Sequence, residues 1–103
     1  MEKRELLELR KRIDEIDASL LALLNQRQSL SIKVGHWKNS EGLKIFDPGR
    51  ERDLLDSLKK LNAGPLSDQA LANIYRQIIS ASVAAQALIK VGYLGPEATF
   101  AHE

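Results

Sequence analysis

The feature that most constrains the fold is a long amphipathic segment, from about Lys3 to Asn39, that contains no proline and no cluster of turn-forming residues. Its apolar residues alternate at spacings of three and four, the heptad pattern of a helix packed on other helices. They are Leu6, Leu9, Ile13, Ile16, Leu20, Leu23, Leu30, Val34 and Trp37. The pattern predicts one very long helix, which ends near Gly42, a residue suited to a left-handed cap.

The length of this helix predicts a second chain. About 34 helical residues span about 51 Å, whereas a compact monomer of 103 residues has a diameter of roughly 33 Å. The helix is apolar along its whole length, and two shorter helices cannot cover it. We therefore expect an intertwined helical homodimer. The alternative is a monomeric bundle whose first helix bends or breaks, with Gly35 as the candidate break point.

Two further helices complete an all-α fold of three helices. Asp47 and Pro48 are suited to the N-cap and first position of the second helix, and residues 62–65 (Asn-Ala-Gly-Pro) end it. Ser67 caps the third helix, which continues to about Lys90. The pattern then changes to a short strand-like piece and a Gly-Pro turn. We expect a domain of residues 1–90, because residues 91–103 are too few to form another.

Composition excludes several classes of protein. The chain has no cysteine and only two histidines, His36 and His102, so ordinary metal sites are not expected. A formal net charge of +1 argues against nucleic acid or an anionic membrane surface as the main partner. No apolar run approaches the roughly 20 residues of a membrane span. Because signal-peptide features are also absent, we expect a cytoplasmic protein.

Two cations fall on one face of the long helix. Counting on from Leu23, Arg27 occupies the next position of the apolar stripe, where a charge is costly unless it is paired or binds an anion. Lys38 lies eleven residues later, which leaves about 20° of angular offset and about 16 Å of axial separation. The two can hold a small anion between them. Equally, Arg27 can pair with an acidic residue in the core while Lys38 is a solvated end.

The other helices carry polar candidates too. Ser82 and Gln86 are one turn apart among apolar neighbours, so they can line a polar pocket or be satisfied core groups. Arg50 and Glu51 fall in the first turn of the second helix, where a solvent-facing ion pair is the usual explanation. Arg10 lies about 42 Å from the end of the first helix. From its surroundings alone it is a surface arginine.

These residues occur in segments that resemble the all-helical chorismate mutases. The resemblance covers residues 5–90 in order and spacing, through four segments: residues 9–27, the Val-Gly-x-x-Lys of residues 34–38, residues 45–52 with their Asp-x-x-Arg-Glu, and the Ser-x-x-x-Gln of residues 82–86. Residues 91–100 look like the first strand and loop of a prephenate dehydratase. The layout is that of the bifunctional mutase–dehydratase of phenylalanine biosynthesis, with residues 91–103 as the truncated start of the second domain.

The resemblance implies an isomerase that converts chorismate to prephenate without a cofactor or metal. Arg27, Arg50 and, from the partner chain, Arg10 would bind the two carboxylates, with Ser82 assisting. Lys38 and Gln86 would donate to the ether oxygen, and Glu51, with Asp47 nearby, would hold the ring hydroxyl. The sequence departs from the family at His36, Trp37 and Gly49, none of which is an implied ligand. Trp37 continues the apolar stripe and is interpreted as packing.

Two other classes of function compete. A non-catalytic helical interaction module explains the heptad pattern and the dimer equally well, but not the polar residues on faces that should be apolar. A nucleic-acid-binding bundle would need a basic face and more positive charge.

Overall fold

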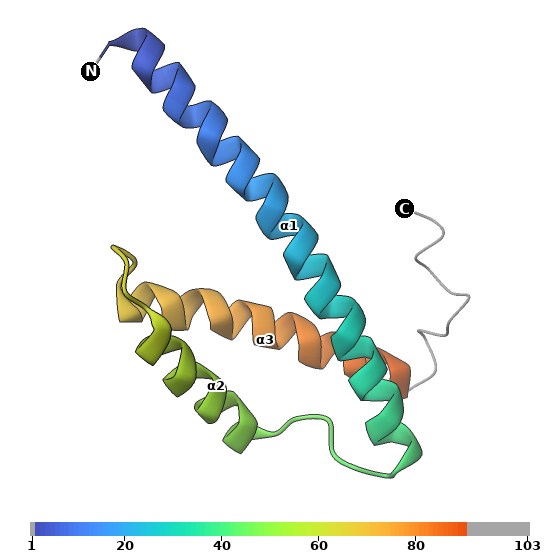
Figure 1. Ribbon diagram of the computed structural model, residues 1–103. Coiled ribbons are helices and arrows are strands. Elements are labelled where there is room, and N and C mark those ends of the chain that lie inside the picture. Colours follow the sequence, from blue (N-terminus) through green and yellow to red (C-terminus); the bar gives the residue numbers. More distant parts are fainter. Residues whose placement is uncertain (1, 91–103) are drawn as a thin grey trace, which may run out of the picture.

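A computed structural model describes residues 2–90 as three α-helices: α1 (Lys3–Ser40), α2 (Pro48–Leu61) and α3 (Asp68–Lys90). The predicted all-α class and the very long first helix are therefore confirmed (Figure 1). α1 continues through Gly35 without a break, so the alternative of a helix interrupted there is wrong. The predicted boundary after Lys90 and the segment 91–103 lie outside the described residues.

The ends of the helices follow the local signals in the sequence. Gly42 adopts a left-handed conformation, with φ of 70°, just beyond the end of α1. The Asp47 carboxylate caps α2 by accepting a hydrogen bond from the Arg50 backbone N–H at 3.1 Å. At the start of α3, Ser67 Oγ accepts from the Ala70 N–H at 3.0 Å. Side-chain oxygens thus satisfy backbone donors that have no partner within either helix.

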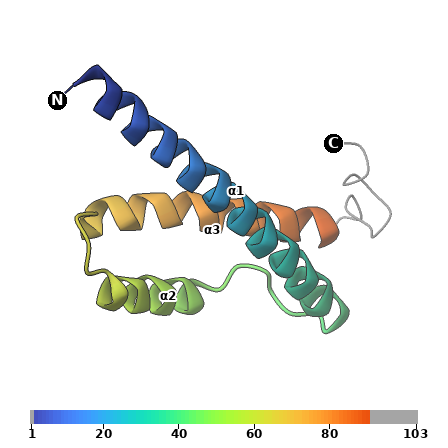
Figure 2. The ribbon, with the colours of Figure 1, turned by 45° about the horizontal axis from the view of Figure 1, so that its top comes forward.

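α3 is the element that joins the structure. α3 crosses the C-terminal half of α1. In both ribbon views α2 runs antiparallel along α3 (Figures 1 and 2). The core is small: Leu71, Ala72 and Ala85 are its buried hydrophobic residues, and no large side chain among the described residues is fully buried. Three helices in this open arrangement therefore bury little apolar surface within one chain.

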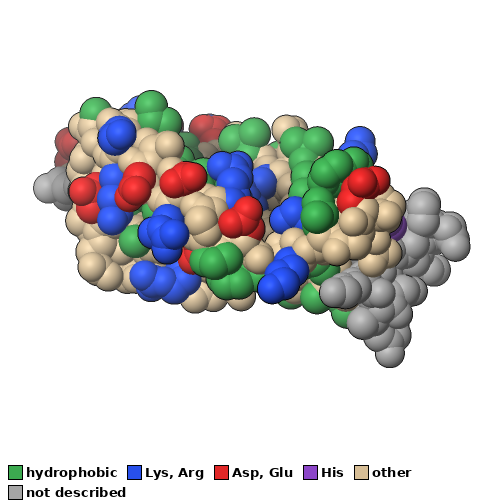
Figure 3. All heavy atoms as spheres, turned by 90° about the horizontal axis from the view of Figure 1, so that it is seen from below, with side chains coloured by type: hydrophobic (Ala, Val, Ile, Leu, Met, Phe, Trp, Pro, Cys, Tyr) green, Lys and Arg blue, Asp and Glu red, His purple; other side chains and the backbone are tan. Residues whose placement is uncertain are grey.

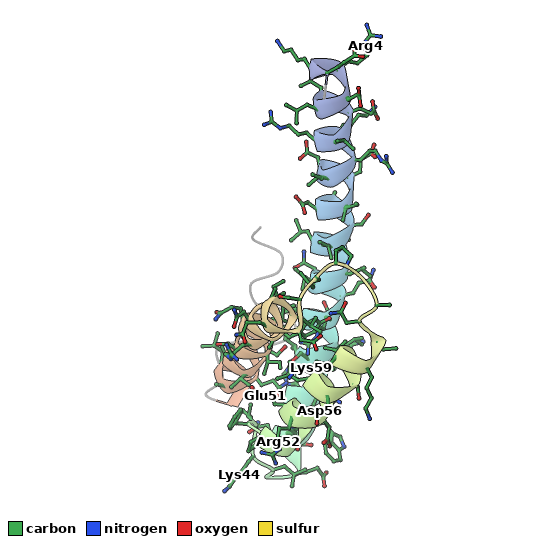
Figure 4. All side chains as sticks on the ribbon, turned by 90° about the vertical axis from the view of Figure 1, so that its left-hand side faces the viewer. Arg4, Lys44, Glu51, Arg52, Asp56 and Lys59 are labelled. Carbon is green, nitrogen blue, oxygen red and sulfur yellow. The ribbon has the colours of Figure 1, made fainter. Side chains whose placement is uncertain are left out.

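The N-terminal half of α1 extends away from the other two helices. Figure 4 shows its side chains, from Arg4 onward, projecting where neither α2 nor α3 reaches. Large apolar residues here are strongly exposed, among them Ile13 at 55%, Ile16 at 59% and Leu20 at 50%. The radius of gyration is 17.4 Å and the longest extent 57 Å, against about 13 Å expected for the radius of gyration of a compact chain of this length. We call residues 3–23 the arm of α1.

No helix within residues 2–90 is both long enough and apolar enough to cross a membrane.

Candidate active site

A cavity of about 270 Å³ lies between the C-terminal half of α1, the loop and first turn of α2, and α3. Its size is close to the lower end, about 300 Å³, of small-molecule sites. Its polar lining comprises Arg27, Ser31, Lys38, Asp47, Arg50, Glu51, Ser82 and Gln86, and its apolar lining Leu30, Val34, Ile45, Phe46, Leu54, Ile79 and Val83. Seven of the eight substrate-binding residues that the resemblance implies therefore line one cavity, from α1, α3 and the start of α2 with its N-cap.

Arg27 lies half-buried on α1 and faces α3. Its Nη1 donates to Ser82 Oγ at 2.6 Å, a contact between residues 55 positions apart in sequence. Ser82 is only 7% exposed. Because a hydroxyl is a neutral acceptor, this contact orients the guanidinium without neutralising its charge. Arg27 therefore keeps its remaining N–H groups and its charge for an anion in the cavity.

Lys38 is held at the opposite end of the same face. Its Nζ donates to the backbone carbonyl of Ile45, in the loop before α2, at 3.0 Å. An ammonium group has three hydrogens, so two remain for a ligand. The shared face predicted for Arg27 and Lys38 is confirmed in that both line one cavity.

The N-cap and first turn of α2 contribute three charged residues, which differ in exposure and in the hydrogen bonds they already make. Asp47 lines the cavity, but its Oδ1 is occupied as the N-cap. Arg50 is exposed and Glu51 half-buried, and both line the cavity. The N-terminus of α2, a position that favours anions, borders the same space through Arg50 and Glu51. Both carboxylates can accept a hydrogen bond from a ligand hydroxyl, Asp47 through Oδ2, because its cap uses only Oδ1.

Gln86 is 8% exposed and packs against α1 at Gly35. A Cβ built on Gly35 would stand 2.8 Å from Gln86 Cγ and 3.2 Å from its Cα. Gly35 is thus a close-packing position, where a larger residue would require Gln86 to shift. Gln86 Nε2 donates to Ser31 Oγ at 2.8 Å, while its Oε1 is buried without a partner in the described part of the chain.

Two predicted residues lie outside this arrangement. Arg10 is exposed on the arm and does not line the cavity of its own chain. It precedes Lys38 by 28 residues on one unbroken helix, about 42 Å. Trp37 is 59% exposed within one chain, and its packing stays a prediction.

Sequence reasoning missed Ser31 and the apolar lining. Ser31 follows Arg27 by four residues, so the count that joined Arg27 to Lys38 also places it on that face. The apolar lining could not be separated from ordinary core residues by pattern alone.

The cavity carries three cations, Arg27, Lys38 and Arg50, against two carboxylates, Asp47 and Glu51. This balance favours a small anion. In the space-filling view of the face seen from below, basic side chains are interspersed with acidic and apolar ones, unlike a continuous nucleic-acid-binding surface (Figure 3). Residues 2–90 contain no group of three His, Cys, Asp or Glu side chains placed to hold a metal ion.

Comparison with known proteins gives a consistent result. The family model for chorismate mutase type II matches residues 9–87. The bifunctional chorismate mutase/prephenate dehydratase of Aquifex aeolicus is 46% identical over 103 residues, covering 96% of this chain and 28% of that protein. The corresponding protein of Escherichia coli K12 is 32% identical over 111 residues, covering 94% of this chain and 29% of that protein. The chain thus spans little more than a quarter of these relatives.

A solved structure agrees in fold over nearly its full length. A chorismate mutase (form II) from Thermus thermophilus superposes with a TM-score of 0.79 at 30% sequence identity, covering 81% of this chain and 94% of that one. The superposed region therefore makes up almost all of that chain.

Proposed function

Because the chain belongs to the type II chorismate mutase family, we propose that it catalyses the rearrangement of chorismate to prephenate in the cavity between α1, α2 and α3. The observation that carries the proposal is the convergence of Arg27, Lys38 and Gln86 on one small cavity. An interaction module has no need of charged and amide groups placed around a space that the chain itself leaves empty.

The reaction is pericyclic: one C–O bond breaks while one C–C bond forms, and no nucleophile is required. A catalyst has two tasks. It must hold the flexible substrate in its compact, chair-like conformer, and it must stabilise the negative charge that develops on the ether oxygen. Groups that interact more strongly with that oxygen in the transition state than in the ground state lower the barrier.

The cavity supplies groups for both tasks. Arg27, oriented by Ser82, and Arg50 would bind the carboxylates, since a guanidinium matches a carboxylate with two parallel hydrogen bonds. Lys38 and Gln86 would donate to the ether oxygen. Glu51 would accept from the ring hydroxyl, with Asp47 fixing the first turn of α2 as its cap.

The direct test is an assay of this chain with chorismate, in which the loss of the ultraviolet absorbance of chorismate measures turnover. Arg27→Ala is the matched control. We expect turnover by the unsubstituted chain and almost none by the variant. Absence of turnover, with helicity intact, would support the interaction-module alternative.

A homodimer in which Arg10 enters the partner's cavity is the second part of the proposal. The arm presents exposed apolar residues along its length, and a second copy of the chain is the simplest cover. One chain offers three cations against two carboxylates in its cavity. A fourth cation from a partner's arm would raise the excess to two, which matches the two carboxylates of chorismate.

Sedimentation equilibrium at micromolar concentration tests this arrangement. We expect about twice the 11.5 kDa chain mass. A stable and active monomer would contradict a site shared between chains. A cytoplasmic location stays a prediction.

We also propose that residues 91–103 begin a prephenate dehydratase segment. The match to the Aquifex aeolicus protein covers 96% of the chain, so it cannot be confined to residues 1–90. Deleting residues 91–103 is expected to leave mutase turnover unchanged. A large loss would place the domain boundary later in the chain.

A further inference from the structure

Ser31 has no role in the mechanism above, yet it contacts one of its main groups. It lies half-buried on α1, lines the cavity, and its Oγ is 2.8 Å from Gln86 Nε2. The contact joins residues 55 positions apart. It occurs next to the close approach of the two helices at Gly35, so the Gln86 side chain has little room to move away from the hydroxyl.

The orientation of the Gln86 amide leaves one end unsatisfied. With Nε2 directed at Ser31, Oε1 is buried and without a partner among the described residues. A buried carbonyl oxygen without a donor is costly. The two ends of an amide are nearly the same in shape, and a serine hydroxyl can either accept or donate. Exchanging the ends would let the Ser31 hydroxyl donate to Oε1, and neither hydrogen of Nε2 would then be engaged by Ser31.

We propose that Ser31 is a positioning residue for Gln86, an inference that rests on the proposed function. In the substrate complex its hydroxyl donates to Gln86 Oε1 and thereby fixes Nε2 as the donor to the ether oxygen. Without that hydroxyl, the amide can present either end to the substrate, and the carbonyl end would oppose the negative charge that develops there.

The test is Ser31→Ala, with Ser80→Ala as the matched control, because Ser80 is an exposed serine on α3. We expect kcat of Ser31→Ala to fall about three- to tenfold, the net contribution of one hydrogen bond. KM is expected to change little, since the lost effect belongs to the transition state. Ser80→Ala is expected to match the unsubstituted chain. Equal kcat for Ser31→Ala and Ser80→Ala would overturn the inference.

A double-mutant cycle separates positioning from packing. If Ser31 acts through the amide, Ser31→Ala has no further effect on turnover in a Gln86→Ala background. The same fold-loss in both backgrounds would mean that Ser31 acts independently of Gln86, which also overturns the inference.

A pH profile in a Gln86→Glu background gives a measurement that does not depend on the overall level of activity. A hydroxyl that donates to the ionised carboxylate lowers the pKa of that carboxylate, so removing it raises the pKa. Ser31→Ala is therefore expected to shift the activity midpoint of Gln86→Glu to higher pH, and an unchanged midpoint would contradict the inference. Absence of turnover by the unsubstituted chain would instead overturn the proposed function itself.

Discussion

The two halves of α1 share one sequence pattern and have different surroundings. In the C-terminal half, Arg27, Ser31 and Gly35 face α3, and the cavity is formed there. In the arm, Ile13, Ile16 and Leu20 keep the same three-and-four spacing, but each is at least half exposed. The heptad pattern therefore identifies a face that must be covered, without saying whether the cover comes from the same chain or from another.

The chemistry differs between the halves as well. The half that meets α3 interrupts its apolar stripe with Arg27, and the polar groups opposite, Ser82 and Gln86, are more buried than most leucines of the molecule. The arm keeps its charges on the outside of the stripe. One half thus lines a cavity with polar groups, and the other presents an exposed apolar surface. The predictions below test this division.

The largest expected effect comes from the cavity-forming half. Arg27→Ala and Lys38→Ala are each expected to reduce kcat/KM by about 100-fold or more, the usual effect of removing one preorganised donor or charge. Chorismate turnover measures the loss, and circular dichroism checks that the helices persist. Loss of helicity in step with activity would instead assign Arg27 a role in holding α1 to α3.

The arm is expected to respond through assembly. Ile16→Glu places a charge on the face that the proposed partner covers, and a buried unpaired charge is strongly unfavourable. We expect sedimentation to report a monomer and turnover to fall with dimer content. Glu8→Gln, a polar change on the same arm, is the matched control and is expected to remain dimeric. A monomeric Ile16→Glu protein with full activity would contradict the proposal that the arm of a partner chain completes the site.

Gln86→Glu tests whether residue 86, in the cavity-forming half of the comparison, acts as a hydrogen-bond donor to the substrate. A neutral amide donates at any ordinary pH, whereas glutamate donates only when protonated, with a reference pKa of about 4.3. The variant is expected to be poorly active at neutral pH and to recover as pH falls, while the parent shows little such dependence. Helicity must be followed in the same samples. Activity that is flat with pH in a folded variant would exclude donation from residue 86 to the ether oxygen.

The smallest expected effect comes from a complementation experiment that tests whether the arm of one chain serves the cavity of the other. Arg10→Ala and Lys38→Ala, mixed and refolded, should form heterodimers as about half of all dimers. In each heterodimer one cavity carries both lesions and the other neither. The mixture should therefore recover about one quarter of the parent activity if arms are exchanged. A mixture no more active than its two components would contradict donation of Arg10 across the interface.

The sequence by itself determined the helices and which polar residues of one helix share a face. Proline, glycine and capping residues fix where helices begin and end through local backbone chemistry, so the ends at Gly42, Asp47 and Ser67 were predictable. The helical period fixes which residues of one helix share a face, so Arg27 with Lys38, and Ser82 with Gln86, were predictable as pairs. The roles of Arg10 and of the first turn of α2 came from resemblance, because nothing local distinguishes those residues from surface charges.

Only the tertiary structure decided how the pairs meet. The contact of Arg27 with Ser82, the contact of Gln86 with Ser31, and the closeness of α3 at Gly35 depend on the crossing of α1 and α3. The crossing is set by side-chain packing between segments more than 50 residues apart. A periodic pattern on one helix does not say which residues of another helix lie opposite it. For that reason Gly35, which the pattern offered as a break, is a point of close approach, and Ser31 emerged as a site residue only in the folded chain.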